Sequence, residues 1–421
     1  LTPEDLYSII SKECKRSHER KTSMINTIDI SGKWELFISE NELSSLPAKY
    51  NDNINLPDTL SNAAKVAENK NKDEGYLTDK YTFTGYAWFR RSLTLESDMT
   101  GFVSVLTLER TRVSTLYIDG AEVGTCDSLC STHRYDISSY MTAGTHEIVI
   151  RVANVGYKTG GGHMTSPDTQ TNWLGIVGKM NIEIYPKSYI SDVRVIASAD
   201  GLLSLRGCVI GADNAYIMAT VTAPDGIRVL KANIIADGDT FEAEFRLENA
   251  QLWDEFERNV YRLTLQCGED IYNTTFGFVT FSNIDRKLLV NGGESFLRGK
   301  HDGLIFPLTG YAPCDVNEWK ERLKIAVSYG INHYRFHTCC PPDAAFTAAD
   351  ELGIYMEPEL PFWGTIAAKG EDGYNEEEQN YLINEGIRII REFSHHRYDV
   401  ARKRALGQSR KTGRNNRYSP L

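Results

Sequence analysis

The sequence predicts a multidomain fold that combines β-sandwich domains with an α/β segment. From Gly32 to about residue 281, short runs of alternating or β-branched apolar residues are separated by Gly, Asp and Asn turns. Beyond residue 281, strand-like runs alternate with helical patterns, which is typical of a parallel sheet. The 421 residues accommodate roughly two to four domains.

Residues 1–24 predict a short N-terminal helix. Thr2 offers a capping hydroxyl, Pro3 suits the first helical turn, and apolar residues follow at helical spacing at Leu6, Ile9, Ile10 and Cys14. We expect this helix to lie on the surface of the protein.

Residues 25–187 predict a jelly-roll β-sandwich. Its strand-like runs include YTFTGYAWFRRSLTL, FVSVLTLERTRVSTLYIDGAEVG and THEIVIRVAN. Asp119-Gly120 between two of these runs is a strong hairpin signal. Closely spaced antiparallel strands over such a length are typical of a jelly roll.

Residues 188–281 predict a second sandwich, of immunoglobulin-like type. About seven short strands fit into fewer than a hundred residues, with Pro224-Asp225-Gly226 as one of the hairpin turns. We interpret this domain as a spacer.

Residues 282–396 predict three βα units. Asp315, with Glu318 three residues later, predicts a capped helix that ends before Gly330. The next unit has strands at 331–336 and 354–356 around an Ala-rich helix at 343–352, for which Gly353 is a stop signal. A third helix is expected at about 375–395.

Charged and aromatic residues gather where these strands end. Parallel α/β folds place ligand-handling groups at the carboxyl ends of their strands. Arg298, His301 and Asp302 end the first strand. We expect a site there, built from Arg298 and His301 of that strand and from Arg335, His337, Glu357, Glu359 and Trp363 at the ends of the next two.

Several of these segments resemble glycoside hydrolase family 2, whose members include β-galactosidases, β-glucuronidases and β-mannosidases. LVNGGESFLRGKHDG and YRFHTCCPPDAAFTAADELGIY are similar to the opening of its catalytic (β/α)8 TIM barrel. GYAWFRRSLTL, LYIDGAEVG and RYDISSYMTAGTHEIVIRVAN resemble its sugar-binding-type domain, and AQLWDEFERNVYRLTLQ its second β-domain. The resemblance covers about residues 25–396 and implies that the α/β segment is an incomplete barrel.

The resemblance also implies roles for individual residues. Arg335 and His337 match a motif implied to bind substrate, although ion pairing inside the barrel mouth is an equal alternative. Glu357 and Glu359 match a carboxylate position implied to shape the sugar pocket. His337 could also serve as the base of a thiol nucleophile beside Cys339 or Cys340, but no orienting third group is evident.

The loop at 154–173 is implied to reach the pocket from the jelly roll. It is rich in glycine, and a strand rather than a helix follows it, so it does not fit a phosphate-binding loop. Asp168 and Trp173 could contact sugar, because carbohydrate pockets use a carboxylate acceptor and an aromatic platform. Turn capping and packing explain these two residues equally well.

The catalytic carboxyl pair expected of the family is not evident in this sequence. Retaining hydrolysis uses two carboxyl groups roughly 5 to 5.5 Å apart, and Glu357 and Glu359 on one strand cannot flank opposite faces of a sugar. In the family, a Glu after Gly-Asn follows the third helix, whereas this chain departs from the pattern after His396. We expect a family-2 glycosidase acting on terminal β-linked sugars, inactive as this chain. The alternative is a non-catalytic carbohydrate-binding protein that uses its β-domains.

The segment 397–421 is a basic tail without family resemblance. It holds eight Lys and Arg residues against one acid, Asp399, while the whole chain has a net charge of −11. We expect a change of reading frame after His396, with a natural interaction tail as the alternative. The acidic body argues against a nucleic-acid partner.

The remaining composition gives few further signals. No apolar run reaches the 18 or more residues of a membrane helix, and the N-terminus lacks the apolar centre of a signal peptide, so we expect a soluble protein of open localisation. A homo-oligomer is possible. The eight cysteines have no CxxC or zinc-finger spacing, so we expect buried free thiols and assign neither cofactor nor metal, even beside Cys126, Cys130 and His133.

Overall fold

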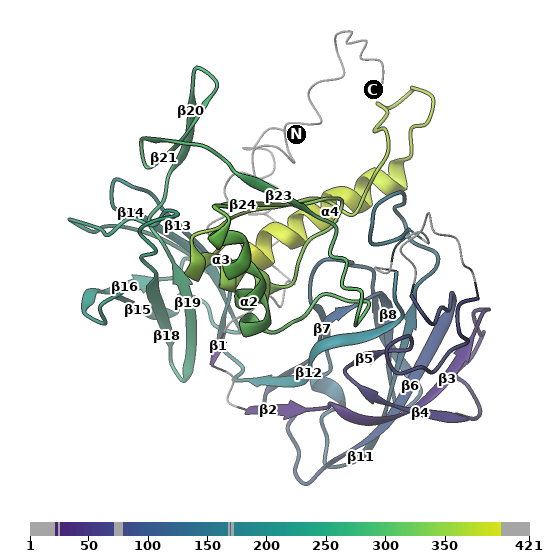
Figure 1. The fold of residues 1–421 in the computed structure, drawn as a ribbon. Coiled ribbons are helices and arrows are strands. Elements are labelled where there is room, and N and C mark those ends of the chain that lie inside the picture. Colours follow the sequence, from purple (N-terminus) through teal and green to yellow (C-terminus); the bar gives the residue numbers. More distant parts are fainter. Residues whose placement is uncertain (1–21, 24–25, 71–78, 167–168, 170–171, 397–421) are drawn as a thin grey trace, which may run out of the picture.

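The computed structural model describes residues 22–23, 26–70, 79–166, 169 and 172–396. The described chain consists mostly of β-strands (Figure 1), with the first β-region at the lower right and the second at the left. The helices of the α/β segment lie between and above these two regions in the same view.

The first β-region contains two antiparallel sheets. One has the strand order β4-β3-β6-β11-β8-β9 and the other β10-β7-β12-β2, with β5 also pairing with β12. Trp34 and Phe89 of the first sheet share one buried core with Leu106 and Ile182 of the second. The strands are β2 Asn26–Asp29, β3 Gly32–Ser39, β4 Asp52–Leu56, β5 Asp58–Thr59, β6 Tyr86–Leu95, β7 Val103–Thr111, β8 Val113–Ile118, β9 Ala121–Cys126, β10 His133–Asp136, β11 Gly144–Ala153 and β12 Gly175–Tyr185.

The second β-region also pairs a larger sheet with a smaller one. The orders are β1-β19-β18-β15-β16 and β13-β14-β17, and Leu203 of the smaller sheet and Leu263 of the larger sheet lie in one buried core. The strands are β1 Thr22–Ser23, β13 Tyr189–Ala197, β14 Leu202–Ile210, β15 Tyr216–Thr222, β16 Arg228–Ile235, β17 Thr240–Arg246, β18 Tyr261–Cys267 and β19 Asp270–Phe276.

Strand β1 corrects the expected extent of the N-terminal helix. Thr22 and Ser23 pair antiparallel with β19, so the end of the range 1–24 is extended rather than helical. The rest of that predicted helix lies outside the described residues. The chain therefore joins the second β-region before it enters the first.

A small antiparallel sheet leads into the α/β segment, which has parallel strands. The strands are β20 Phe281–Ile284, β21 Lys287–Val290 and β22 Gly293–Ser295, followed by β23 Gly299–Asp302, β24 His333–Phe336 and β25 Tyr355–Pro358. β24 lies between β23 and β25 and is parallel to both, which confirms the predicted parallel arrangement. The carboxyl ends of the three strands therefore meet at one edge.

The three predicted helices of this segment are confirmed: α2 Val316–Ser328, α3 Asp343–Leu352 and α4 Glu376–Phe393. The Asp315 carboxylate accepts hydrogen bonds from two backbone N–H groups in the first turn of α2, as its capping pattern predicts. Gly353 ends α3 in the left-handed conformation, at φ +74°, where glycine has no steric penalty.

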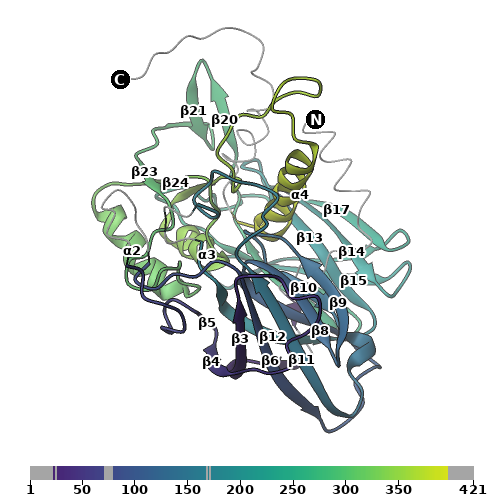
Figure 2. The ribbon, with the colours of Figure 1, turned by 90° about the vertical axis from the view of Figure 1, so that its right-hand side faces the viewer.

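A buried carboxylate holds α4 against the first β-region. Glu385 of α4 is fully buried and accepts hydrogen bonds from Ser128 Oγ at 3.0 Å, Leu129 N at 2.9 Å and Cys130 N at 2.8 Å. Arg388, one turn later, donates to Asp127 at 2.9 Å. We call residues 127–132 the docking loop; α4 lies above the first β-region in two perpendicular views (Figure 2).

Apolar side chains also pack together where α4 contacts the first β-region. Leu129, Cys130 and Met164 of the first β-region lie in one buried core with Phe346 of α3 and Phe393 of α4. The core of the α/β segment is therefore completed by side chains from another part of the chain.

One cysteine differs from the expectation of free thiols. Cys208 is disulfide-bonded, whereas the other described cysteines are free.

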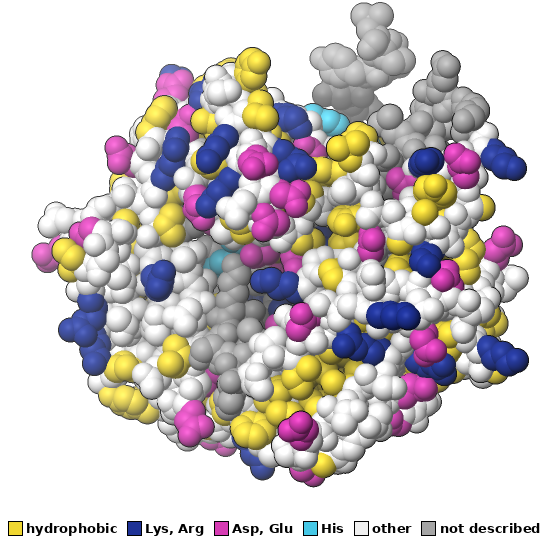
Figure 3. Space-filling model, turned by 60° about the horizontal axis from the view of Figure 1, so that its bottom comes forward, with side chains coloured by type: hydrophobic (Ala, Val, Ile, Leu, Met, Phe, Trp, Pro, Cys, Tyr) yellow, Lys and Arg dark blue, Asp and Glu magenta, His cyan; other side chains and the backbone are white. Residues whose placement is uncertain are grey.

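Among the described residues, each helix is too short or too polar to cross a membrane. On the face shown in Figure 3, basic and acidic side chains are interspersed.

Removing the Glu385 carboxylate should loosen the docking loop. Glu385→Ala leaves three donors of that loop without their acceptor, and such a loss costs roughly 3 kcal/mol. We expect much faster amide hydrogen exchange at Leu129 and Cys130, measured by mass spectrometry or NMR. Glu377→Ala, an exposed position in the first turn of the same helix, is the control and should leave this exchange unchanged. Unaltered exchange in Glu385→Ala would contradict the role given to Glu385.

Stability should fall on acidification because of His133 in β10. Its imidazole is fully buried, with Nε2 donating to Ser128 O at 2.7 Å, and burial lowers its pKa from 6.5 to about 4. As the pH drops through 6.5, the His133 imidazole therefore becomes protonated in the unfolded chain before it does so in the folded one. The free energy of unfolding falls by on the order of 3 kcal/mol by pH 4. Unfolding free energy measured between pH 7 and pH 4 should show this loss.

The variant His133→Gln should flatten that part of the pH profile. The control is His146→Gln. Asp119 accepts a hydrogen bond from His146 and raises the pKa of that imidazole, so the group stabilises the fold at low pH and its removal should not reduce the acid loss. Equal profiles for wild type and His133→Gln would show that another group controls the acid sensitivity.

Candidate functional site

The Glu359 carboxylate is the centre of the polar groups at the strand ends. Arg335 Nε donates to Glu359 Oε1 at 2.6 Å, and the backbone N–H of Thr338 donates to Oε2 at 2.9 Å. His337 Nδ1 lies 3.5 Å from the same Oε2. The loop after β24 is thus tied to the loop after β25.

Aromatic rings surround this carboxylate group. The ring centroid of His337 lies 5.0 Å from that of His301, 5.2 Å from that of His163 and 5.4 Å from that of Trp363. The Trp363 side chain is 68% exposed, so its face is available to a ligand. An exposed aromatic ring beside a carboxylate, a guanidinium and imidazoles can bind a polyhydroxylated ligand by stacking and hydrogen bonding.

The glycine-rich loop of the first β-region packs directly on this site. Trp363 N donates to Gly160 O at 3.2 Å, and Thr159 Oγ1 donates to Pro361 O at 3.1 Å. Gly161 has φ +74°, and a Cβ atom added there would overlap the carbonyl oxygen of Trp363. Glycine is therefore required both for the backbone conformation and for the close approach.

His163 enters the site through this loop. Its backbone N–H donates to Thr338 Oγ1 at 2.8 Å, and Thr338 itself adopts φ +52°, which is strained for a β-branched residue. Burial, followed by the neighbouring His337 and His301, lowers the pKa of His163. A neutral imidazole here can both donate and accept hydrogen bonds.

Five of the nine predicted site residues come together, and the others do not. His301, Arg335, His337, Glu359 and Trp363 form the cluster described above. Asp168 lies outside the described residues. Arg298, Glu357 and Trp173 are placed elsewhere.

The expectation that Arg298 ends the first strand is wrong. β23 begins at Gly299, so Arg298 lies at the opposite end of the strand from the site. There its Nη2 donates to Glu255 at 2.5 Å and its Nε to Gly330 O at 2.5 Å. The side chain holds the α/β segment to the second β-region.

Glu357 and Trp173 are buried. Glu357 Oε2 lies 3.0 Å from His333 Nε2, and both side chains are buried. Trp173 is 8% exposed and lies under the Arg112 guanidinium, 4.1 Å from ring centroid to carbon, where it serves packing rather than an open platform.

The thiol-nucleophile alternative meets an unfavourable environment. Cys339 and Cys340 are both fully buried. Burial, with Asp302 next, raises the pKa of Cys339 well above its ordinary value, which disfavours the thiolate needed for attack.

Comparison with known proteins relates this chain to β-glycosidases. A curated protein of Formosa agariphila named "Putative beta-glucuronidase" is 24% identical over 355 residues, covering 79% of this chain and 41% of that protein. A β-galactosidase of Thermoanaerobacter pseudethanolicus is 22% identical over 379 residues, covering 80% and 49%. No family model matches the chain.

Solved structures share the fold. A β-glucuronidase of an uncultured Clostridium sp. superposes with a TM-score of 0.72 at 17% identity, covering 90% of this chain and 67% of that one. A glycosyl hydrolase family 2 member from Bacteroides cellulosilyticus gives 0.68 at 15% identity, covering 88% and 50%. The resemblance to glycoside hydrolase family 2 is confirmed. The chain spans about half the length of the curated relatives it matches.

Sequence reasoning missed two residues of this strand-end site, His163 and Thr338. His163 directly follows three glycines in the loop implied to reach the pocket, so its position was a usable signal. Thr338 was not recognisable, because its role depends on a left-handed backbone and on contacts from two loops.

Alanine at Gly161 should displace the glycine loop from this site. The control is Gly156→Ala in the same loop, because Gly156 has a similar φ of +69° but open space around its would-be Cβ. Both variants incur the left-handed penalty of roughly 1 kcal/mol, whereas Gly161→Ala adds an overlap worth about 1 to 3 kcal/mol more. We expect Gly161→Ala to lower the melting temperature more than Gly156→Ala does, and only Gly161→Ala to alter the tryptophan fluorescence. Equal effects of the two variants would show that the loop does not pack as described.

Proposed function

We propose that this chain forms part of a family-2-type glycoside hydrolase that acts on terminal β-linked sugars by the retaining, two-carboxylate mechanism. The cluster at the strand ends, with Glu359 linking Arg335 to His337 beside the exposed Trp363, is the observation that carries this proposal. In this proposal, the cluster forms one wall of a sugar pocket and presents charged hydrogen-bonding groups and an aromatic face.

Each group has a defined task in this proposal. Trp363 stacks on the apolar face of a sugar ring, and the Arg335 and Glu359 pair bonds its hydroxyl groups. Neutral His163 and the neighbouring His337 add donors and acceptors whose orientation is fixed by the loop contacts. The glycine loop closes the pocket on the side of the first β-region.

The catalytic carboxyl pair is a separate requirement. Glu359 is partly exposed at the site, whereas Glu357 is buried against His333, so these two acids do not supply an acid/base and a nucleophile on opposite sides of a sugar. We therefore propose that this chain binds sugar without hydrolysing it. The proposed fold is a jelly roll, an immunoglobulin-like sandwich and the first three βα units of a TIM barrel.

The test measures sugar binding and turnover with the whole 421-residue chain. Methyl β-glucuronide and methyl β-galactoside are the first ligands to test, because the relatives are named as a β-glucuronidase and a β-galactosidase. Binding is followed by Trp fluorescence or NMR during titration. Turnover is assayed with nitrophenyl β-glycosides. We expect binding without turnover. Glu359→Gln should weaken binding by roughly 10- to 100-fold, because it removes a charge-assisted hydrogen bond at the centre of the cluster.

The control variant is Glu294→Gln. It removes an exposed ion pair with Lys287, whose Nζ lies 2.7 Å from Glu294 Oε2, at a position outside the site. It should bind sugar like the wild type. Sugar binding that persists unchanged in Glu359→Gln would favour the alternative, in which the β-domains bind carbohydrate by themselves. Clear hydrolysis by the purified chain would refute the proposed absence of turnover.

A further inference from the structure

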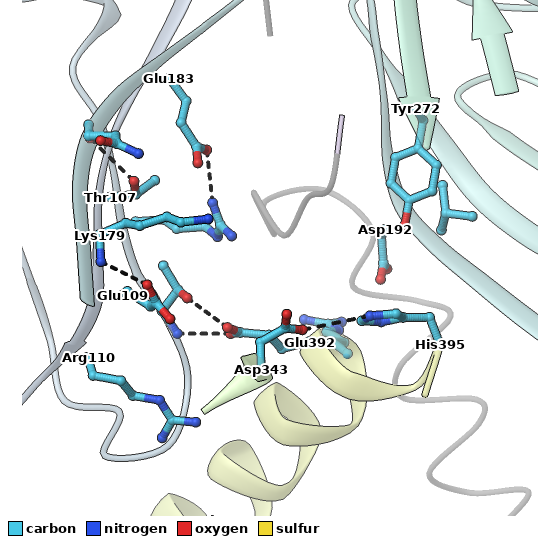
Figure 4. A pocket seen from close by; sticks show the side chains of 15 residues that line it. Thr107, Glu109, Arg110, Lys179, Glu183, Asp192, Tyr272, Asp343, Glu392 and His395 are labelled. Atoms are coloured by element: carbon cyan, nitrogen blue, oxygen red, sulfur yellow. Dashed lines mark hydrogen bonds and ion pairs between the residues drawn. The ribbon is translucent and has the colours of Figure 1, made fainter. Parts of the chain in front are cut away.

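A polar cavity lies where the two β-regions meet the α/β segment (Figure 4). Its volume is about 180 Å³, and its lining includes Lys179 of the first β-region, Asp192 of the second, and Asp343 and His395 of the α/β segment. The residues of the sugar-site cluster do not line it. The cavity is therefore a second place at which ligating side chains converge.

Asp343 and His395, which line this cavity, form a cluster with His396 beside it. Asp343 is the first residue of α3, and His395 and His396 follow the end of α4; their ligand atoms all lie within 4.8 Å of one another. Asp343 Oδ1 is 3.0 Å from His396 Nε2 and 3.8 Å from His395 Nε2. Tetrahedral zinc with bonds of 2.0 to 2.1 Å sets its donors about 3.3 Å apart, between these two values.

The second nitrogen of His396 is held by another carboxylate. His396 Nδ1 donates to Asp350 Oδ2 at 2.7 Å, which directs Nε2 towards Asp343 and His395. Ring stacking on Phe346, with centroids 5.4 Å apart, fixes the imidazole plane. A metal-binding histidine commonly has such a carboxylate on its other nitrogen, which sets the tautomer and raises its basicity as a ligand.

We propose that Asp343, His395 and His396 bind a divalent transition metal ion, with zinc as the best match. Two imidazole nitrogens and one carboxylate oxygen are a donor set that suits zinc. Asp350 is a positioning residue for His396. The cavity beside Asp343 and His395 leaves room for a water molecule as the fourth ligand.

The competing arrangement has no metal, and His396 then only hydrogen-bonds Asp350 through Nδ1 and Asp343 through Nε2. A bound ion would link the start of α3 to the end of α4 and so stabilise the α/β segment.

The experiment uses the full chain without a histidine tag, stripped with EDTA and dialysed. We expect zinc to bind with a stoichiometry of one in calorimetry and to raise the melting temperature. Cobalt should give the visible absorption of a tetrahedral site. His395→Ala and the isosteric Asp343→Asn should each lower zinc affinity by at least about 100-fold. Asp350→Asn should lower it roughly 10- to 100-fold while retaining the ligands.

The matched control is His146→Ala, which removes a histidine paired with Asp119 in the first β-region. It should bind zinc like the wild type. Melting temperatures in EDTA identify any variant that has lost its fold. If a ligand variant is unfolded, the zinc affinity of Asp350→Asn decides instead. Absence of stoichiometric zinc binding by the wild type, or wild-type affinity in His395→Ala and Asp350→Asn, would overturn the proposal.

Discussion

The buried carboxylate of Glu385 is the constraint on which the arrangement of the α/β segment depends. A sheet of three parallel strands with three helices buries too little apolar surface to be stable alone. Here Glu385 accepts three hydrogen bonds from the docking loop, and Leu129 and Met164 complete the core around Phe346. Since an unpaired buried carboxylate is costly, this contact selects one position of α4.

The same docking assembles the candidate site from two parts of the chain. The parallel strands supply Arg335, His337 and Glu359, while the first β-region supplies His163 through a loop that approaches the backbone at Trp363. Thr338 remains in its strained conformation because Glu359 and the His163 backbone both hold it. The β-region therefore does more than cover the segment; it also determines which groups face the pocket.

Predictions based on local chemistry were the most accurate. The α3 range and the Gly353 stop were correct because helix propensity, capping and glycine conformation act within a few residues. The parallel order of β24 and β25 followed from the helix between them. Arg298 was misplaced because the strand begins one residue later, which moves a side chain from one end of the sheet to the other.

By itself, the sequence determined that β-regions precede a parallel α/β segment, where the helices of that segment begin and end, and which strand ends carry Arg335, His337 and Glu359. Only the tertiary structure decided which partner each charged group has: Glu357 lies buried with His333, Trp173 under Arg112, and His163 beside Thr338. The physical reason is range. Hydrophobic periodicity and capping are properties of neighbouring residues, whereas ion pairing and burial depend on segments that are far apart in the chain until it folds.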